Sequence, residues 1–587
     1  MQTLKLPLWL SFLLLLAVTI PPHVIGIDKF ATIDEPWWVI SGSNYYYALT
    51  HHDFANTIYD YHPAVTTTWV VTAGMLTVFP AYRGFGQGYF DVRKFNFDDF
   101  LKEHGKSTLD LLRNSRLIQS ALLIVLALLS FFLLQLLIDR LVALLSIALA
   151  FDAPFFLGHS RLLNHEGMLA LFALVSVLAM LVYLRTGRKW IYLLLSGAAF
   201  GLAQLTKSPS IVVIPVVGLM LFIGLFERGK SLGAKLLDAA KVFAIWLVSA
   251  AVVYVLLWPG MWVAPGRMLY EIYGNAFSYA FQGARLDVTQ ELQPAKFSLG
   301  TGVTGTLNFL GRWALRSTPV TWLGLLLAAW WVVRRTRSNG KGSSREEGHV
   351  SGLQPTERCD ALVMSYLVLL AMLFILMFGV AQGRDSAHYI LTSYVALDVV
   401  AGIGWGLALA SLAASRPELG QMRVVVPVFA VLFALQLASA LPYYPYYYTY
   451  ENPLIQAVSG KPIVYGYGEG LEQAAAYLAA KPDAGAMKVY AYDGLGPFSY
   501  FFPGTTDVFK KVYLTEPGLP SVIQGMQHAD YLVVYSAVQD ALPESAAFLN
   551  AMQSVAPEKT IYIGGLDYAR IYRIADIPAS VYAQMAK

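Results

Sequence analysis

A few short segments of this chain contain ionisable and polar side chains that can carry out acid–base and phosphate chemistry. The chain as a whole is 56% hydrophobic and only 14% charged. Ionisable groups at membrane depth are energetically unfavourable, so each such segment predicts a functional site. The segments are Asp34-Glu35, His51-His52, Tyr61-His62-Pro63, Ser160-Arg161-Leu162-Leu163-Asn164-His165-Glu166, Thr206-Lys207-Ser208-Pro209, and Arg384-Asp385 with His388-Tyr389.

The residue types in these segments suit the two halves of one reaction. Carboxylates with histidines between them serve as a general base or hold a divalent cation. Arginine, lysine and histidine side chains bind a phosphate group. Together they indicate transfer from a donor with a phosphate leaving group to a hydroxyl acceptor. One carboxylate removes the acceptor proton, and the cations, or a metal, neutralise the charge that develops on the departing phosphate.

Each segment taken alone also has a structural interpretation, and the sequence leaves these alternatives open. An Asp-Glu pair before a proline can cap a helix, and paired histidines can be ordinary surface residues. An arginine and a glutamate one helical turn apart can form an ion pair, and a lysine at a helix end can extend toward the interface. The residues concerned are Asp34-Glu35, His51-His52, Arg161 with Glu166, Lys207, and Arg384 with Asp385. The functional interpretation therefore depends on their joint placement.

The shortage of charge argues against an ordinary soluble protein. Soluble domains carry about 25% charged residues, whereas this chain of 587 residues carries 14% and has a mean hydropathy of +0.52. We therefore expect a multi-span membrane protein. The net charge of +4 comes with basic residues scattered through short loops, which gives nucleic-acid binding little support. Because Cys359 is the one cysteine, an internal disulfide and a cysteine-based zinc site are excluded.

Apolar runs of roughly 20 residues, the length that crosses a bilayer, predict a polytopic α-helical membrane protein with about eleven transmembrane helices. The first run continues into Pro21-Pro22 without an obvious small-residue cleavage site, so we expect an uncleaved span. The least regular run ends in Asp152 and Pro154. The predicted spans are 6–26, 117–138, 141–158, 166–184, 190–205, 209–226, 240–258, 318–333, 361–381, 388–411 and 423–441.

Basic residues in the short connections predict the orientation, because cytoplasmic loops are enriched in Lys and Arg. With a cytoplasmic N-terminus, every inner connection carries at least one basic residue. These connections contain Arg140, Arg185-Thr186-Gly187-Arg188-Lys189, Arg228 to Lys235, Arg334 to Arg345, and Arg416 to Arg423. The parity of the spans then puts all the polar segments on the outer side, where we expect acids from two segments and bases from two others to line a common pocket.

The expected domain division is a transmembrane catalytic domain over 1–442 and a small extracytoplasmic α/β domain over 443–587. Long outer loops are expected at 27–116 and 259–317, and the polar inner loop 335–358 is rich in Gly and Ser, which is typical of a flexible linker.

The C-terminal region changes character after an aromatic run, Tyr443 to Tyr448, that is typical of a membrane interface. Short β-rich runs then alternate with a helical one. We expect strands at Pro462 to Tyr465, Lys488 to Tyr492, Tyr531 to Tyr535 and Thr560 to Ile563, and a helix at Leu471 to Ala480. Gly466, Gly468 and Gly470 can cradle a phosphate at a helix start, but their spacing does not fit a dinucleotide-binding motif, which favours a tight turn.

At these residues the chain resembles the lipid-phosphate-sugar-dependent membrane glycosyltransferases of the C type (GT-C). It looks closest to glycosyltransferase family 39, which includes protein O-mannosyltransferases and relatives of the aminoarabinose transferases. The resemblance covers roughly residues 1–442, in a consistent order. Its motifs are Ile33-Asp34-Glu35-Pro36, Tyr61-His62-Pro63, Ser160-Arg161-Leu162 with Glu166, Thr206-Lys207-Ser208-Pro209, and, in altered form, Arg384 with His388-Tyr389.

The resemblance implies a role for each matched residue. Asp34 would be the general base. Glu35 and Glu166, together with His165 and in the vicinity of His62, would position the acceptor or hold a metal. The donor phosphate would be bound by Arg161, Lys207, Arg384, His388 and Tyr389. Many relatives have Asp where this chain has Glu166, which leaves metal use open. They have Arg where it has His388, and Pro where it has Thr392, which leaves the phosphate contact and its pH dependence open.

The function expected is therefore an inverting glycosyltransferase in the cell membrane that uses a polyprenyl-phosphate-linked sugar and an outer-face hydroxyl acceptor. The acceptor can be a protein, a lipid or a glycan, and a protein O-mannosyltransferase is the narrower alternative. A divalent metal ion is the one cofactor considered. A transporter or lipid flippase is the alternative from another class, but the charges lie at span ends rather than near the bilayer midplane, where transporters place them.

Overall fold

The computed structural model describes residues 7–226, 231–282, 299–340, 355–381, 386–416, 418, 422–459, 464–510, 514, 518–535 and 546–585. The chain divides into two compact units. Unit 1 contains 1–25, 45–70 and 117–458, and unit 2 contains 26–44, 71–116 and 459–587. Four helices contribute residues to both units: α2 (Glu35–Thr50), α3 (Val65–Val78), α5 (Thr108–Leu134) and α20 (Pro453–Ser459).

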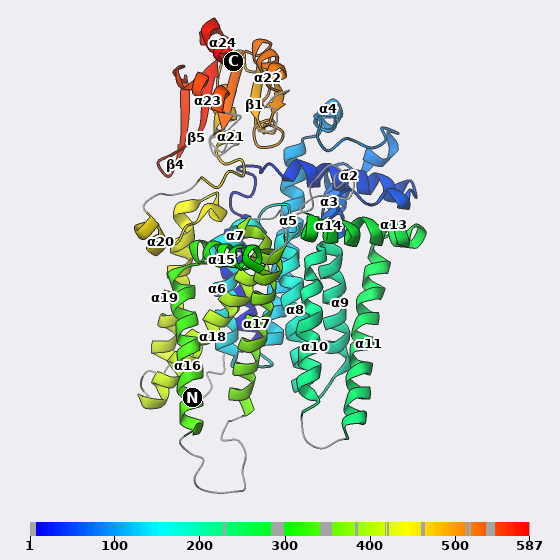
Figure 1. Ribbon diagram of the computed structural model, residues 1–587, viewed down its shortest axis with the longest axis vertical. Coiled ribbons are helices and arrows are strands. Elements are labelled where there is room, and N and C mark those ends of the chain that lie inside the picture. Colours follow the sequence, from blue (N-terminus) through cyan, green and yellow to red (C-terminus); the bar gives the residue numbers. More distant parts are fainter. Residues whose placement is uncertain are drawn as a thin grey trace. The chain divides into compact units, whose positions relative to one another are not determined.

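Unit 1 consists mainly of long apolar helices. Its members α8 to α11 stand side by side with nearly parallel axes in Figure 1. The helices of this bundle, besides α5, are α1 (Leu8–Val24), α6 (Arg140–Phe151), α7 (Pro154–Ser160), α8 (Glu166–Arg185), α9 (Trp190–Thr206), η3 (Ser208–Val212), α10 (Val213–Gly224), α11 (Leu232–Leu257), α16 (Pro319–Gly340), α17 (Pro355–Val380), η5 (Ala387–Ile390), α18 (Leu391–Ser415) and α19 (Met422–Ala440).

Six helices in the described part of the chain are long and apolar enough to cross a membrane, or seven if α6 and α7 form one bent span. Five shorter apolar helices lie among them in the sequence. Each predicted span overlaps one of these helices, which supports a multi-pass membrane protein, whereas the count of eleven stays a prediction. The run 141–158 is broken between α6 and α7 with a bend of 66°. Pro154 occupies the first turn of α7, where its missing N–H is tolerated.

Two segments expected to be loops contain helices. Within 27–116 the structure has α2, α3, η2 (Pro80–Gly84) and α4 (Asn96–Glu103), and α5 begins at Thr108, earlier than expected. The early part of α5 alternates polar and apolar residues at helical spacing, and such a pattern continues a helix beyond the hydrocarbon. Within 259–317 short helices lie across the ends of the long ones (Figure 1). They are α12 (Gly260–Val263), α13 (Pro265–Leu269), η4 (Tyr270–Gly274), α14 (Asn275–Gln282) and α15 (Leu299–Arg316).

Small residues bring α16 and α18 into close contact, as is common between membrane helices. A β-carbon added to Gly404 would collide with the carbonyl oxygen of Gly324, and one added to Gly324 would collide with Ala401. We therefore expect Gly404→Ala to lower the free energy of unfolding by about 1–3 kcal/mol, the range typical of overpacking. Thermal unfolding of the purified protein in detergent measures the change.

Gly218 in α10 provides the matched control for this prediction. It also lies in a membrane helix, but a β-carbon added there meets nothing within 4 Å. Gly218→Ala should leave stability unchanged or raise it slightly, because alanine favours a helix by about 1 kcal/mol over glycine. Equal losses in both variants would contradict close packing of α16 on α18.

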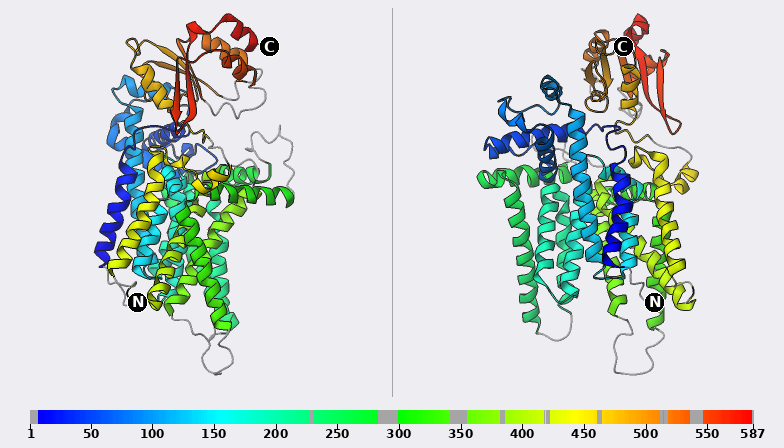
Figure 2. Two further views of the ribbon diagram at one scale, coloured as in Figure 1. Left: turned by 90° about the vertical axis from the view of Figure 1, so that its left-hand side faces the viewer. Right: turned by 180° about the vertical axis from the view of Figure 1, so that it is seen from behind.

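Unit 2 contains a five-stranded sheet with the strand order β2-β1-β3-β5-β4 (Figure 2). β1 pairs in parallel with β2 and β3, and β5 pairs antiparallel with β3 and β4. The strands are β1 (Lys488–Tyr492), β2 (Thr505–Phe509), β3 (Tyr531–Tyr535), β4 (Lys559–Ile563) and β5 (Leu566–Arg573). The sheet is accompanied by α21 (Leu471–Ala479), α22 (Leu519–Gln527), α23 (Ala546–Gln553), η12 (Ile574–Asp576) and α24 (Ala579–Met585).

Three of the expected strands and the expected helix are present as β1, β3, β4 and α21. The strand expected at 462–465 is partly outside the described residues, and Val464 and Tyr465 are not in a strand. The central strands β1 and β3 are almost wholly buried, which explains why their apolar runs were visible in the sequence. The remaining short elements are η1 (Phe54–Asn56), η7 (Leu441–Tyr443), η8 (Tyr447–Thr449) and α20 (Pro453–Ser459). The domain boundary at 442/443 stays a prediction.

Candidate functional site

A buried ion pair between Glu166 and Lys207 is the centre of the polar residues in unit 1. Glu166 is the first residue of α8, and Lys207 directly follows α9. The Lys207 ammonium donates to Glu166 Oε1, and both side chains are buried. The pair holds together two helix ends that are 41 residues apart in the sequence.

Four further residues predicted from the sequence surround this pair. His165 Nε2 lies 3.4 Å from Glu166 Oε1, and the His62 ring centroid lies 5.1 Å from that of His165. The Lys207 ammonium lies 4.6 Å from the centre of the Tyr389 ring, a cation–π geometry. His388 contacts Tyr389, with ring centroids 4.5 Å apart. The structure thus brings together His62, His165, Glu166, Lys207, His388 and Tyr389, which we call the Lys207 cluster.

The Lys207 cluster lies where helices begin or end. His62 precedes α3, His165 and Glu166 open α8, and η5 supplies His388 and Tyr389 just before α18. The first turn of a helix carries unpaired N–H groups and a partial positive charge, which favours the Glu166 carboxylate there. Burial lowers the pKa of His165, and the Lys207 ammonium lowers it further. The His165 imidazole is therefore neutral at neutral pH, whereas the Lys207 ammonium contributes a formal positive charge.

Arg161, which is also predicted to bind the donor phosphate, has described contacts with two other residues. Arg161 donates through Nη2 to the carbonyl oxygen of Ile25 at 2.6 Å, and its guanidinium lies 5.0 Å from the centre of the Tyr447 ring. These contacts connect α7 to the end of α1. Arg384 lies outside the described residues.

Asp34 and Glu35 belong to unit 2, where they open α2. Thr32 and Glu35 close a turn just before α2: the Glu35 N–H donates to the Thr32 carbonyl at 3.3 Å, and Glu35 Oε2 accepts from the Thr32 N–H at 2.7 Å and from its hydroxyl at 3.0 Å. The Glu35 carboxylate has a second partner. It also accepts from Arg116, which donates through Nε at 2.7 Å and through Nη2.

Arg116 is a buried residue that sequence reasoning missed. It also donates to the carbonyl oxygens of Ile27 and Phe30, so it holds the whole segment that leads to Asp34. The available signal was an arginine at the start of an otherwise apolar run. With both charges buried, Glu35 and Arg116 form a structural clamp, and Asp34 next to them is exposed.

Two C-terminal residues next to Asp34 were also missed. The Tyr467 hydroxyl donates to Asp34 Oδ2 at 2.5 Å. Asp493 interacts electrostatically with Asp34, and burial together with this like charge raises the pKa of Asp493 to about 6, against the opposing effect of Lys510. Neither residue carries a sequence signal, because each is more than 400 positions from Asp34.

The expected joint pocket of Asp34 with Glu166 stays a prediction, because the two residues belong to different compact units. His51 and His52 are exposed, in agreement with the surface interpretation. Around the three glycines, the N–H groups already have protein acceptors: that of Tyr467 donates to Glu469, that of Gly468 to Tyr535, and that of Gly470 to Glu472. Positive φ angles at Gly466, Gly468 and Gly470 complete a tight turn into α21, as the spacing favoured.

A metal fits poorly among the residues that the structure describes. These residues include no group of three or more His, Cys, Asp or Glu side chains arranged to hold a metal ion. Glu166 has the Lys207 ammonium at its carboxylate, in the position where a cation would bind. We therefore assign no catalytic step to a metal.

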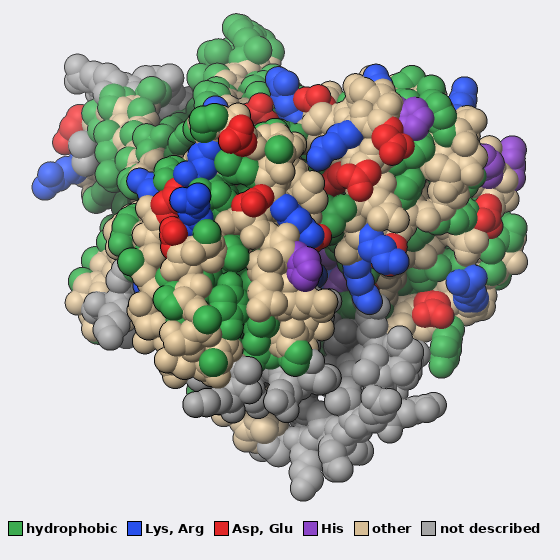
Figure 3. Space-filling model, turned by 90° about the horizontal axis from the view of Figure 1, so that it is seen from above, with side chains coloured by type: hydrophobic (Ala, Val, Ile, Leu, Met, Phe, Trp, Pro, Cys, Tyr) green, Lys and Arg blue, Asp and Glu red, His purple; other side chains and the backbone are tan. Residues whose placement is uncertain are grey.

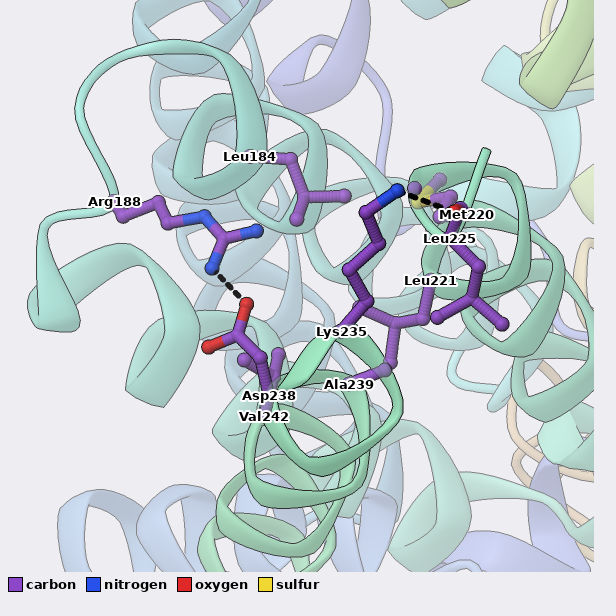
Figure 4. Close-up of a pocket in the computed structure, with 10 residues that line it drawn as sticks. Leu184, Arg188, Met220, Leu221, Leu225, Lys235, Asp238, Ala239 and Val242 are labelled. Atoms are coloured by element: carbon purple, nitrogen blue, oxygen red, sulfur yellow. Dashed lines mark hydrogen bonds and ion pairs between the residues drawn. The ribbon is translucent and has the colours of Figure 1, made fainter. Parts of the chain in front are cut away.

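A small pocket of about 150 Å³ lies far from the Lys207 cluster (Figure 4). It is lined by Leu184, Met220 and Leu221 among others, with Arg188, Lys235 and Asp238 at its polar side. Arg188 pairs with Asp238, and Lys235 donates to the Leu225 carbonyl at 3.0 Å. Because α8 has 20 residues, this pocket is about 30 Å along the helix from Glu166. It is a helix-end contact and not part of the site.

Charge on the molecular surface is mixed. Seen from above in Figure 3, acidic, basic and histidine side chains are interspersed with hydrophobic ones, so the coloured part of this face has no broad area of one sign.

Residues 110–258 match the profile of a family described as dolichyl-phosphate-mannose-protein mannosyltransferase. This segment contains Arg161, His165, Glu166 and Lys207 but ends before His388. No curated protein sequence matches the chain at a significant level.

Several solved structures are similar in part. A protein O-mannosyltransferase Pmt1–Pmt2 complex from S. cerevisiae, bound to the sugar donor, is 18% identical with a TM-score of 0.33, over 44% of this chain and 34% of that one. ArnT from Cupriavidus metallidurans, bound to undecaprenyl phosphate, is 14% identical with a TM-score of 0.46, over 98% of both chains. The Archaeoglobus fulgidus oligosaccharyltransferase, in complex with Zn and sulfate, is 12% identical with a TM-score of 0.46, over 97% of this chain and 74% of that one.

The family match covers the segment that carries the Ser-Arg-Leu and Thr-Lys-Ser-Pro motifs, and it confirms the resemblance drawn from them. It also favours an enzyme over a transporter. Over residues 110–258 the chain is similar to the dolichyl-phosphate-mannose-protein mannosyltransferase family, and its long apolar helices are those of a multi-pass membrane protein.

Proposed function

We propose that this protein is an inverting glycosyltransferase that moves a sugar from a polyprenyl-phosphate donor to a hydroxyl acceptor at the outer face of the membrane. The observation that carries the proposal is the Lys207 cluster: one ammonium, one carboxylate and three imidazoles at the ends of apolar helices. Glu166, His165 and Lys207 lie in the segment that matches a family named for a lipid-phosphate sugar donor.

The chemistry assigned to the chain's own residues is a single displacement. Asp34 takes the proton of the acceptor hydroxyl as its oxygen attacks the anomeric carbon. The bond from that carbon to the phosphate oxygen breaks, and the lipid phosphate leaves with the electron pair. Attack opposite the leaving group inverts the anomeric configuration. Lys207, with its ammonium held beside Glu166 and Tyr389, offers donors to the departing phosphate.

Other residues receive supporting roles. His388 and Tyr389, which are half-buried, and Arg384 belong to the donor-phosphate side of the proposal, as does Arg161. His62, His165 and Glu166 belong to the acceptor side. Glu35 is assigned to holding the segment that carries Asp34, because its carboxylate is engaged by Arg116 and Thr32. The proposed topology has a cytoplasmic N-terminus and an extracytoplasmic region after residue 442.

Incubating the purified full-length protein with a panel of polyprenyl-phosphate hexoses and pentoses tests the proposal. We expect release of free polyprenyl phosphate with one sugar, in proportion to glycosylated product, and an inverted anomeric configuration by NMR. Parallel reactions with a chelator measure any dependence on a divalent metal. No release with any member of the panel, together with lipid movement across liposomes, would contradict the proposal and favour a flippase.

A protein acceptor is the second candidate, because the matched family is described as a protein mannosyltransferase. Adding serine- and threonine-containing peptides to the active donor distinguishes the two cases. Mannosylated peptide, detected by mass spectrometry, would support a protein acceptor. Transfer only to lipid or glycan hydroxyls would contradict it and leave the broader proposal intact.

A further inference from the structure

The C-terminal region of the chain reaches Asp34 through one hydrogen bond. Tyr467 is buried, and its hydroxyl donates to Asp34 Oδ2 at 2.5 Å. Both residues lie in unit 2, although 433 positions separate them in the sequence. Asp34 itself is exposed, so the buried phenol approaches the carboxylate from the protein side.

The Tyr467 hydroxyl is a permanent donor. Burial raises the pKa of Tyr467 well above its usual value, and the Asp34 carboxylate raises it further. The phenol therefore stays protonated at neutral and acidic pH. A protonated donor stabilises the charged form of the carboxylate, because a hydrogen bond to an ionised acceptor is stronger than one to a neutral acceptor.

Tyr467 is held in place by the turn that carries it. Its N–H donates to Glu469 Oε2 at 2.9 Å, and Glu469 in turn accepts from the Tyr535 hydroxyl at the end of β3. The Ile33 N–H donates to the Tyr467 carbonyl at 3.3 Å, so the backbone next to Asp34 pairs with the same turn.

A second contact supports the same arrangement in unit 2. A β-carbon added to Gly496, which has a φ of 92°, would collide with the Pro36 ring. The segment around Asp34 is therefore closely packed against two C-terminal turns.

We propose that Tyr467 is a positioning residue for Asp34: it holds one carboxylate oxygen and keeps the carboxylate ionised, so that Asp34 acts as the base at neutral and mildly acidic pH. This inference rests on the proposed function, in which Asp34 takes the acceptor proton. It also means that the region after residue 442 takes part in the catalytic function.

Some of the other charged groups near Asp34 favour its ionised form, and others disfavour it. Like charges raise the pKa of a carboxyl group, and opposite charges lower it. The groups that face this segment are Glu35 with Arg116, Asp493 with Lys510, and the neutral phenol of Tyr465. Each acidic group comes with a basic partner, and the Tyr467 hydroxyl donates directly to the Asp34 carboxylate, so its loss should change the titration of Asp34.

Tyr467→Phe, which removes the hydroxyl and keeps the ring, tests the inference in the full-length protein. We expect kcat to fall about tenfold, which corresponds to one hydrogen bond to a charged group, with the KM for the donor within about twofold. In a plot of kcat against pH, the acidic limb should move to higher pH by about one unit. The sign follows because loss of the donor destabilises the ionised carboxylate and raises its pKa.

Tyr477→Phe is the matched control, because the Tyr477 hydroxyl also donates to a carboxylate in unit 2, that of Glu558 at 2.8 Å. It should leave both kcat and the pH profile unchanged. If Tyr467→Phe also leaves the acidic limb unmoved, or if both variants lose activity equally, the positioning role is overturned. A much larger loss of activity in Tyr467→Phe, with an unmoved acidic limb in the turnover that remains, would overturn it too.

A fluorinated tyrosine incorporated at position 467 keeps the inference testable if Tyr467→Phe does not fold. This side chain has nearly the same shape and a more acidic hydroxyl, so the acidic limb should move to lower pH; an unmoved limb would overturn the inference. Asp34→Asn separates this result from the proposed function. If Asp34→Asn retains normal turnover, the base assignment fails, whereas an inactive Asp34→Asn beside an unaffected Tyr467→Phe overturns only the inference.

Discussion

Replacing Asp34 by asparagine is expected to lower the rate of sugar transfer by about 10²- to 10⁴-fold, the contribution typical of a general base. The amide has nearly the same shape as the carboxylate but cannot take the acceptor proton. Folding should be preserved, because Asp34 is exposed and the asparagine oxygen can still accept from the Tyr467 hydroxyl. Product formation with the active donor and thermal unfolding in detergent are measured together.

Asp28→Asn is the control for this prediction. Asp28 is partly exposed, lies six positions before Asp34 in the same unit, and pairs with Arg113 at 3.8 Å. Its replacement should change neither turnover nor stability appreciably, since exposed ion pairs contribute about 0–1 kcal/mol. Turnover of Asp34→Asn within about twofold of the unmodified protein would remove Asp34 as the base.

Replacing Lys207 by methionine is expected to lower the free energy of unfolding by about 3–5 kcal/mol, because it leaves the buried Glu166 carboxylate without its partner. Sugar transfer should be lost as well, since the ammonium is the group assigned to the leaving phosphate. Adding Glu166→Gln to this variant removes the uncompensated charge, so the double variant should regain most of the stability and none of the activity. Thermal unfolding and product formation are measured for both variants and for the unmodified protein.

The stability and the activity of the two Lys207 variants have to be compared with each other. If the Lys207→Met protein and the double variant are equally unstable, the Glu166–Lys207 pair is not the source of the loss. If the double variant regains activity, Lys207 does not act on the phosphate. Arg188→Met is the matched control, because the Arg188–Asp238 pair lies in the same unit but is partly exposed; its loss should change stability by less than about 1 kcal/mol.

Much of the helical architecture is readable from composition, because a helix in the membrane has to satisfy its backbone internally and expose apolar side chains. Each predicted span overlaps a helix, and the apolar runs that predict β1, β3 and β4 correspond to strands. The ends of elements were less predictable. α5 begins at Thr108, and helices occupy two segments expected to be loops, because amphipathic helices at an interface lack the long apolar run that marks a span.

The sequence by itself determined which residue types are available for chemistry, and in which order: the Asp-Glu pair, the His-Pro pair, the His-Glu pair, the lysine turn and the His-Tyr pair. A short motif determines local conformation, as the Thr32–Glu35 turn does, because its partners are only three residues apart. Only the tertiary structure decided the partners. Lys207 meets Glu166 across 41 positions, Arg116 meets Glu35 across 81, and Tyr467 meets Asp34 across 433. The physical reason is that periodicity indicates which face of an element is buried, whereas the packing of whole elements decides which side chains meet there.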